Sequence, residues 1–380
     1  MLSKTISESH GVKPIMSSTN KTYYLKYDII RIVAIFSVLL VHTATYWVSY
    51  SVGTFSADFT TGNIFFGLSR AGVPLFIMLS GALLLNENRK FDTVTFYKKS
   101  LLPIVYIFIG WLLVYGAFYA FLLPLMQNKE ASWKRLIDYI LIFRGTGYPH
   151  LWYLMMLIGL YLITPVLRLF VKKENYKYIV GIVIASLIFH FIPTTLDAFA
   201  KGAIITPSAY MEKFHMESVG GYIAYYLLGW LLDNFELSKS KRTIWYLLSL
   251  LSAVFSISMV QFRFDDEFTF IIDCMYEPTA LPAFIFGSAI FLLIVTLCKD
   301  KKTSSSSIRL LSDCSFGVYL IHVMVLELYI TYIYPIFGTN NHNHPLLFHT
   351  VFYIAVAIVS YFLAIVISKC KYVNRIIRTK

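Results

Sequence analysis

Apolar residues come in long runs along this chain, separated by short polar segments. A bilayer core about 30 Å thick is crossed by roughly 20 apolar residues in an α-helix, so runs of that length predict membrane spans. The sequence contains ten such runs, at residues 28–49, 62–85, 101–126, 150–170, 177–195, 217–235, 243–262, 275–298, 313–335 and 347–369. We therefore predict an all-α integral membrane protein, a bundle of about ten transmembrane helices.

The composition supports this class and excludes a soluble domain. Hydrophobic residues make up 57% of the chain and charged residues only 14%, whereas a soluble domain is about half apolar and a quarter charged. The runs at 177–195 and 217–235 are the weakest of the ten. The shorter stretch 130–144 is amphipathic, so we expect it to lie at the membrane interface.

The positions of Lys and Arg predict the orientation of the bundle, because basic residues favour the cytoplasmic side. Of the 33 Lys and Arg residues, 24 fall on one set of alternating segments, which includes both ends of the chain. The prediction is therefore ten crossings with both termini in the cytoplasm. This pattern also accounts for most of the net charge of +12, so we expect no nucleic-acid partner.

The predicted domain organisation has three parts. Residues 1–27 are polar and contain no apolar core of the kind that a signal peptide needs, so we expect a flexible cytoplasmic tail. Residues 28–369 form the transmembrane domain, and 370–380 form a basic cytoplasmic tail. The four cysteines are too scattered for a disulfide framework or a zinc site, and we expect no bound metal.

Ionisable side chains inside the first run are candidates for function, because they are costly in a membrane. Arg31 and His42 are eleven residues apart, which places them on one helix face and about 16 Å apart along the axis. Asp28 lies one turn below Arg31 on the same side. Asp28 and Arg31 equally suit an ion pair at the inner interface. His42, about two-thirds of the way across, needs a partner or a role, and an imidazole can serve as a general base.

Three later runs carry further polar candidates. Arg70 is expected at a depth similar to that of His42, just before a kink at Pro74, and a deep arginine can pair with an anion. His150 opens the fourth run and suits either an aromatic interfacial belt or the rim of a pocket shared with His42.

In the ninth run, Ser315 and His322 are seven residues apart and so share a face, with Tyr319 close to it. The polar side chains together fit two classes of function. One is a membrane-embedded enzyme with His42 as the base, and the other is a transporter that binds a polar cargo or relays protons.

Four stretches of the sequence resemble the acyltransferase-3 family of multi-pass acyltransferases, which modify bacterial surface glycans. The first is an Arg, ten residues and a His, preceded by an Asp; the second is Ser-Arg-x-x-Val-Pro-Leu-Phe with a following Ser-Gly. The third is His-Leu-Trp-Tyr, and the fourth is Ser-x-x-Ser-x-Gly-x-Tyr-x-x-His. In this chain they fall at Asp28, Arg31 and His42; Ser69–Phe76 with Ser80 and Gly81; His150–Tyr153; and Ser312–His322.

The resemblance implies an O-acetyltransferase of the bacterial cytoplasmic (inner) membrane, most similar to stand-alone surface-polysaccharide O-acetyltransferases such as the one acting on enterobacterial common antigen. It implies acetyl-CoA as the cytoplasmic donor, a glycan hydroxyl as the acceptor, and no permanently bound cofactor. His42 would be the base or acyl carrier, with Arg70 and His150 as further catalytic residues. Arg31 and Asp28 would meet coenzyme A, and Ser315, Tyr319 and His322 would hold substrate or support the site.

One other class of function remains compatible with the sequence. A glycan exporter or flippase would also place polar side chains inside the bundle. A purely structural membrane protein does not explain so many intramembrane ionisable groups. The acceptor glycan, the acyl group, covalent acyl-His42 versus direct transfer, and the oligomeric state are left open by the sequence.

Overall fold

Helices make up almost all of the described chain. The computed structural model describes residues 24–50, 56–141, 150–200, 203–213, 221–263, 268–303, 305–337 and 344–369, and these ranges contain no strand beyond an isolated bridge between Tyr24 and Lys302. The longer helices are α1 (Leu25–Tyr50), α2 (Ala57–Leu68), α3 (Gly72–Leu84), α5 (Leu102–Ala117), α7 (Trp133–Leu141), α8 (Trp152–Phe170), α9 (Tyr176–Ser186), α12 (Tyr222–Asn234), α13 (Lys239–Phe262), α14 (Phe268–Tyr276), α15 (Leu281–Leu297), α16 (Ser306–Tyr332) and α18 (Pro345–Lys369).

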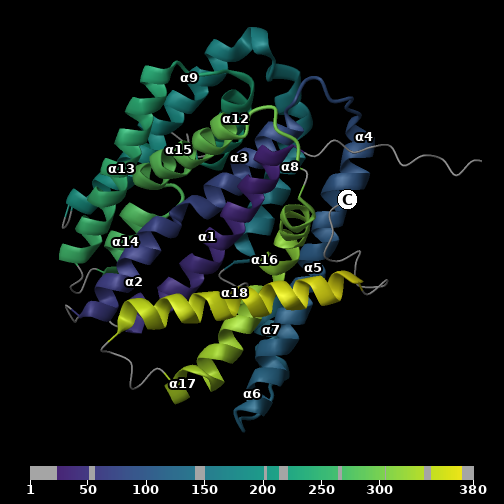
Figure 1. The fold of residues 1–380 in the computed structure, drawn as a ribbon, viewed down its shortest axis with the longest axis vertical. Helices are drawn as coiled ribbons and strands as arrows, with labels where there is room; N and C mark the ends of the chain where they lie inside the picture. Colours follow the sequence, from purple (N-terminus) through teal and green to yellow (C-terminus); the bar gives the residue numbers. More distant parts are fainter. Residues whose placement is uncertain are drawn as a thin grey trace, which may run out of the picture.

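Short helices and turns connect or extend these elements. They are α4 (Thr93–Phe96), α6 (Leu123–Met126), α10 (Ile192–Leu196), α11 (Pro207–Glu212), α17 (Tyr334–Phe337), the 3₁₀ turns η1 (Ser69–Ala71), η4 (Lys173–Asn175) and η6 (Asp197–Phe199), and the π turns η2 (Tyr97–Leu101), η3 (Phe118–Leu122) and η5 (Leu187–Phe191). Helix α1 lies centrally, packed against α2, α3, α16 and α18 (Figure 1). This position brings α1 into contact with helices from both ends of the sequence.

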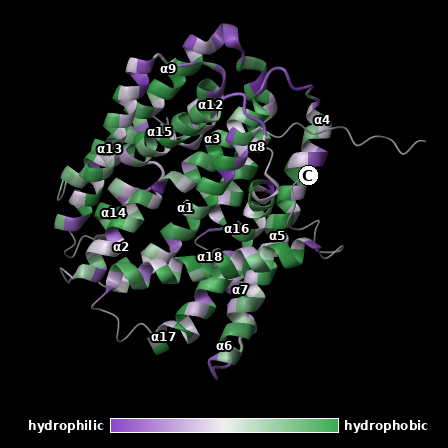
Figure 2. Cartoon of the chain, viewed as in Figure 1, coloured by the Kyte–Doolittle hydropathy of each residue, from purple (hydrophilic) through white to green (hydrophobic). Residues whose placement is uncertain are grey.

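Nine helical segments in the described ranges are long and apolar enough to cross a membrane. They are Leu25–Ser49, Ala57–Leu84, Thr93–Met126, Trp152–Phe170, Lys173–Phe199, Lys239–Phe262, Phe270–Leu297, Ser306–Ile336 and Pro345–Lys369. Figure 2 shows apolar residues along these helices and hydrophilic residues mainly toward their ends. The prediction of an all-α integral membrane protein with about ten helices is confirmed.

The sixth predicted run, 217–235, forms a shorter helix than expected. Helix α12 has 13 residues, about 20 Å by helical rise, while 214–220 lie outside the described residues. Its side chains from Ala224 to Leu231 are all buried. At its start Gly221 lies beside His190 and Thr279, which belong to the interior of other spans. Helix α12 is therefore enclosed by protein and is not exposed to lipid along its length.

The segments predicted to be cytoplasmic meet at one end of the bundle. The Lys26 ammonium pairs with Asp233 at 2.5 Å, and the Leu25 amide donates to the Lys301 carbonyl at 2.9 Å. At the other end, His349 lies 3.3 Å from Asp58. The described contacts thus agree with the predicted alternation of loops between two sides. The assignment of the basic side as cytoplasmic stays a prediction, and the two tails lie almost wholly outside the described residues.

The amphipathic stretch predicted at 130–144 forms α7. Trp133 and Ile137 are exposed, while the helix packs against α5 on its other side. An exposed tryptophan on a short amphipathic helix is typical of a membrane interface.

Two glycines allow α3 and α12 to touch backbone to backbone. A Cβ atom added at Gly81 would lie 1.8 Å from the Tyr226 carbonyl oxygen, and one at Gly229 would lie 1.9 Å from the Met78 carbonyl oxygen. Close approach through small residues is a common way to pack helices in a membrane, where apolar side chains gain little from burial against each other. The contact fixes α12 against the helix that carries Pro74 and Phe76.

Arg168 secures the inner end of α3. Its guanidinium donates to the carbonyl oxygens of Leu84, Asn86 and Arg89 at 2.5, 2.9 and 2.9 Å, and it lies 4.4 Å above the Phe91 ring. These carbonyls lie at or just beyond the negative end of the helix dipole, so a cation there is doubly favourable.

We expect Arg168→Ala to lower the free energy of unfolding by about 1–3 kcal/mol, because up to three carbonyls lose a charged donor. Thermal unfolding in detergent measures the effect. The matched control is Arg135→Ala on the exposed face of α7, which should change stability by less than about 0.5 kcal/mol. Equal melting temperatures for the two variants would contradict this role of Arg168.

Candidate active site

Three histidines from distant parts of the sequence meet in the interior. His42 comes from the middle of α1, His150 from the turn before α8, and His322 from α16. The ring centroids are 5.0 Å apart for His42 and His322, 5.3 Å for His150 and His322, and 6.4 Å for His42 and His150. These residues form what we call the histidine cluster. Sequence periodicity alone did not predict that all three would meet.

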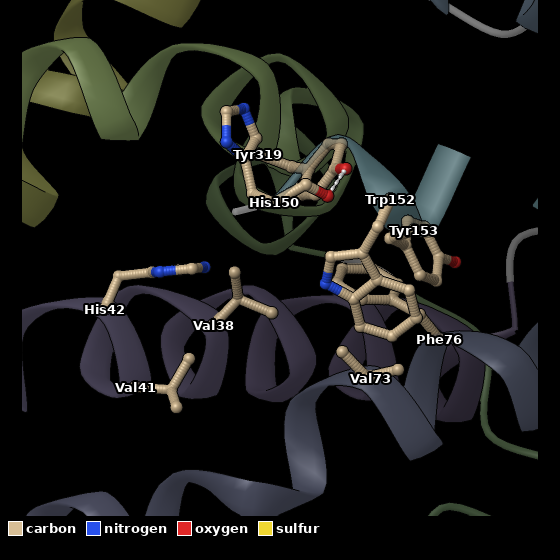
Figure 3. A pocket seen from close by; sticks show the side chains of 9 residues that line it. All are labelled: Val38, Val41, His42, Val73, Phe76, His150, Trp152, Tyr153 and Tyr319. Atoms are coloured by element: carbon tan, nitrogen blue, oxygen red, sulfur yellow. Dashed lines mark hydrogen bonds between the residues drawn. The ribbon is translucent and has the colours of Figure 1, made fainter. Parts of the chain in front are cut away.

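A cavity of about 40 Å³ lies beside the histidine cluster. It is lined by Val38, Val41, His42, Val73, Phe76, His150, Trp152, Tyr153 and Tyr319, which come from α1, α3, the start of α8 and α16 (Figure 3). The space suits about one or two water molecules. The walls are mostly apolar and aromatic, so polar atoms that face the cavity have little competition from solvent.

His322 is held in one tautomer. Its Nδ1 lies 2.7 Å from the Tyr319 carbonyl oxygen, and because a carbonyl only accepts, the ring proton belongs on Nδ1. The Nε2 atom is buried and has no hydrogen-bond partner within the described residues. A lone pair on a buried imidazole nitrogen next to His42 can accept a proton.

His150 is fixed through its backbone while its ring stays available. The Tyr319 hydroxyl donates to the His150 carbonyl oxygen at 2.6 Å (Figure 3), and the Tyr115 ring packs 4.8 Å from the imidazole. Both ring nitrogens of His150 are buried and lack a partner among the residues that the structure describes. Buried polar atoms rarely lack a hydrogen-bond partner, and exceptions call for a functional explanation. Tyr319 therefore positions two members of the histidine cluster.

Arg70 sits in the 3₁₀ turn η1, between α2 and α3, just before Pro74. The predicted distortion next to this proline is therefore present. The guanidinium lies 3.8 Å from the Phe66 ring centroid and 5.1 Å from that of Tyr276. It is close enough to His42 for its charge to act on the imidazole, although Arg70 does not line the cavity described above. Its Nε is buried without a hydrogen-bond partner in the described chain.

A hydrogen-bonded network holds the ring on which Arg70 rests. The Tyr276 hydroxyl donates to Asn63 Oδ1 at 2.5 Å, and Asn63 Nδ2 donates to Gln261 Oε1 at 3.1 Å. The carboxylate of Glu277, in the break between α14 and α15, lies close enough to attract Arg70. Asn63 was missed by the sequence analysis, although it is seven residues before Arg70 and therefore shares its helix face.

The inner end of α1 carries a second polar cluster. Asp28 Oδ1 accepts hydrogen bonds from Ser312 Oγ at 2.7 Å and Arg31 Nη1 at 3.2 Å, and Oδ2 accepts from Thr303 Oγ1 at 2.5 Å. Asp28 is buried, whereas the Arg31 side chain is 33% exposed. Asp28 and Arg31 thus form an ion pair at the end of the bundle that is predicted to be cytoplasmic, as one interpretation of the sequence expected.

Hydroxyl groups lie between this inner cluster and the cavity. The hydroxyls of Tyr153 and Tyr161 both approach Ser80, and Tyr161 is within reach of the charges of Arg31 and Arg89. Tyr153 then lines the cavity beside His42. The sequence analysis missed Tyr161, whose only signal is a hydroxyl within an apolar run.

Ser315, predicted to hold substrate or support the site, makes a hydrogen bond within its own helix. Its hydroxyl donates to the Ser312 carbonyl oxygen of its own helix at 2.8 Å, and it does not line the cavity. The structure also buries His349, which the sequence analysis did not select, stacked 4.0 Å from Trp47. Within the described ranges, no group of three or more His, Cys, Asp or Glu side chains is arranged to hold a metal ion.

The geometry therefore defines a membrane protein with an ionisable site enclosed between α1, α3, α8 and α16. Comparison with known proteins identifies its class: the acyltransferase-3 family model, described as an acyltransferase domain, matches residues 24–369. The chain belongs to this family and is a multi-pass membrane acyltransferase. No curated protein and no solved structure matches it.

Proposed function

We propose that this protein is an O-acetyltransferase that moves an acetyl group from cytoplasmic acetyl-CoA to a hydroxyl of a surface or lipid-linked bacterial glycan, in the inner membrane. The observation that carries the proposal is the histidine cluster: His42 lines a small cavity, and the rings of His150 and His322 are centred 6.4 and 5.0 Å from its own ring. Arg31, about 16 Å away on the same helix, faces the side on which the donor is found.

The inner cluster suits the donor. The phosphates of coenzyme A are anionic, and an arginine binds phosphate through two parallel hydrogen bonds. Asp28 orients Arg31 from its buried side, and Arg89 lies within electrostatic reach of Tyr161, as Arg31 does. The pantetheine arm would then extend past Ser80 and Tyr153 toward His42.

The reaction needs a base for the acceptor hydroxyl and charge near the developing oxyanion. In direct transfer, the hydroxyl oxygen bonds to the acetyl carbon, the carbon–sulfur bond breaks, and the proton passes through His42 to the sulfur. In the covalent alternative, a His42 nitrogen bonds to the acetyl carbon while the carbon–sulfur bond breaks, and the sulfur takes the imidazole proton and leaves as the coenzyme A thiol. The acceptor hydroxyl oxygen then bonds to the acetyl carbon, the nitrogen–carbon bond breaks, and the hydroxyl proton returns to the imidazole. His322 and His150 would stabilise a proton on the cluster in either route, and Arg70 would stabilise the oxyanion.

The match to an acyltransferase family model favours an enzyme over a glycan exporter. The test is transfer of radiolabelled acetyl from acetyl-CoA to endogenous glycan in purified membranes, with polymer export scored in parallel. Lost export of a polymer that is never acetylated would favour the exporter.

We expect Arg31→Ala to raise the KM for acetyl-CoA about tenfold or more, because a phosphate loses a charged donor. The kcat should fall much less, since Arg31 lies far from the reacting carbon. Steady-state kinetics in proteoliposomes measure both constants. The matched control is Lys299→Ala, which removes an exposed cation paired with Glu236 on the same side. An unchanged KM for Arg31→Ala would exclude a role of Arg31 in donor binding.

A further inference from the structure

A second cavity, of about 220 Å³, lies between the η5–α10 segment and α11. It is lined by Phe189, His190, Thr194, Ser208, Met211 and Glu212. By the predicted topology these residues belong to the outer half of the bundle, because the span Lys173–Phe199 ends there. Neither the family resemblance nor the reaction scheme above uses any of them.

Contacts at the start of α12 connect lining residues of the two cavities. Trp152 lines the cavity of the histidine cluster, and its ring is 5.6 Å from that of Tyr222. The neighbouring Gly221 lies against His190, since a Cβ added there would be 3.3 Å from His190 Nε2. One lining residue of each cavity, Trp152 and His190, therefore lies against the start of α12.

The oxygen atoms that line the second cavity are mostly acceptors. The Ser208 hydroxyl donates to Asp197 Oδ2 and the Ser208 amide donates to Oδ1 at 2.9 Å, so the hydroxyl proton is committed. The Thr194 hydroxyl donates to the His190 carbonyl oxygen at 2.8 Å. The Ser208 hydroxyl also lies 3.3 Å from the Thr206 hydroxyl, and His190 lines the cavity as well. The lining therefore combines hydroxyl and carboxylate acceptors with an imidazole that can donate or accept, which suits the hydroxyl groups of a neutral ligand.

The volume and the apolar part of the lining indicate the size and the class of the ligand. A space of 220 Å³ equals about seven water molecules at liquid density, which suits one sugar ring better than several. Phe189 and Met211 supply apolar surface for the C–H face of such a ring. Few convergent polar groups among apolar side chains are usual for a small-molecule site.

We propose that this second cavity is a subsite for one neutral sugar ring of the acceptor glycan, next to the sugar whose hydroxyl is acetylated. This proposal rests on the proposed function, and it adds which part of the protein recognises the acceptor glycan. It assigns part of the acceptor selectivity to Thr194, Ser208 and Glu212, which hold the glycan while a neighbouring hydroxyl reaches His42.

Ligand binding tests the subsite without relying on turnover. The probes are methyl α-glucoside, methyl α-galactoside and methyl α-mannoside, applied up to about 50 mM because one sugar ring binds with a millimolar dissociation constant at best. Saturation-transfer NMR on the full chain in nanodiscs should detect at least one of them. Glucose 6-phosphate should not displace it, because its phosphate would face acceptor oxygens.

Two variants and two matched controls test whether the lining residues bind the hexoside. Glu212→Gln and Thr194→Val should each weaken the hexoside signal about tenfold, because a hydrogen bond to the ligand is lost. The matched controls are Glu130→Gln, an exposed outer carboxylate, and Thr350→Val on α18, whose hydroxyl also donates to a carbonyl four residues earlier. Both controls should bind like the parent protein.

The subsite is overturned if none of the three hexosides binds, or if Glu212→Gln and Thr194→Val bind as well as their controls. His42→Ala should retain the signal, which separates this proposal from the catalytic one. If the protein transfers acetyl but fails these binding tests, only the proposed subsite is contradicted. If it binds hexosides but transfers no acetyl, only the proposed acetyl-transfer reaction is contradicted.

Discussion

Replacing His42 by alanine is expected to reduce acetyl transfer by about a thousandfold, within the range found for removal of a positioned acid–base group. The imidazole is the member of the histidine cluster that lies on α1 and lines the cavity. The rings of His150 and His322 are centred 6.4 and 5.0 Å from that of His42, so either would have to shift to occupy its position. Release of labelled coenzyme A and labelled glycan, measured in proteoliposomes, gives the rate.

His344→Ala serves as the matched control, because His344 is an exposed histidine at the predicted outer side. Both variants should insert and melt like the parent protein. A rate for His42→Ala within about tenfold of the parent would contradict a role as base or acyl carrier, since either role predicts a much larger loss. Mass analysis of trapped protein then distinguishes the covalent route, in which acetyl is found on His42, from direct transfer.

Replacing Gly81 by alanine is expected to disrupt the bundle. The new Cβ would lie 1.8 Å from the Tyr226 carbonyl oxygen and 2.7 Å from its carbonyl carbon, so the backbones of α3 and α12 must separate. We expect a loss of about 3 kcal/mol or more in stability. The same shift would move Phe76 and Tyr226, so activity should fall together with the melting temperature.

The control for Gly81→Ala is the same substitution at Gly159 on α8 or Gly181 on α9, where nothing lies within 4 Å of an added Cβ. There alanine should be neutral or stabilise by up to about 1 kcal/mol, because glycine is the poorer helix former. Thermal unfolding in detergent compares the three. If Gly81→Ala had the same melting temperature as these controls, the result would contradict the close contact between α3 and α12.

The sequence predicted the parts of the fold that depend on local periodicity. The length of apolar runs located nine long helices, and the spacing of Arg31 and His42 placed both on one face of α1. The spacing of Tyr319 and His322 likewise follows from one helix. Segment 217–235 was harder, because a short helix enclosed by protein and a full span have the same apolar composition.

The site depends on contacts between helices, which periodicity does not encode. His42 and His322 are 280 residues apart in sequence, and only the resemblance of motifs in order grouped them. The contact between Tyr319 and the His150 backbone, and the support of Arg70 by Asn63 and Tyr276, depend on how helices rotate against each other. Glu277, in the break between α14 and α15, likewise lies close enough to attract Arg70.

The small cavity beside His42 has a consequence for the energetics of crossing a membrane. In the proposed reaction a thioester and an alcohol become an ester and a thiol, so the number of protons is the same before and after. The histidines hold the proton only between oxygen and sulfur, and no water chain is needed in a space of about 40 Å³. In that reaction the charges of coenzyme A would remain beside Arg31, and only a neutral acetyl group would pass. One turnover would therefore move no net charge between the two sides, and neither a proton gradient nor a membrane potential would drive or oppose it.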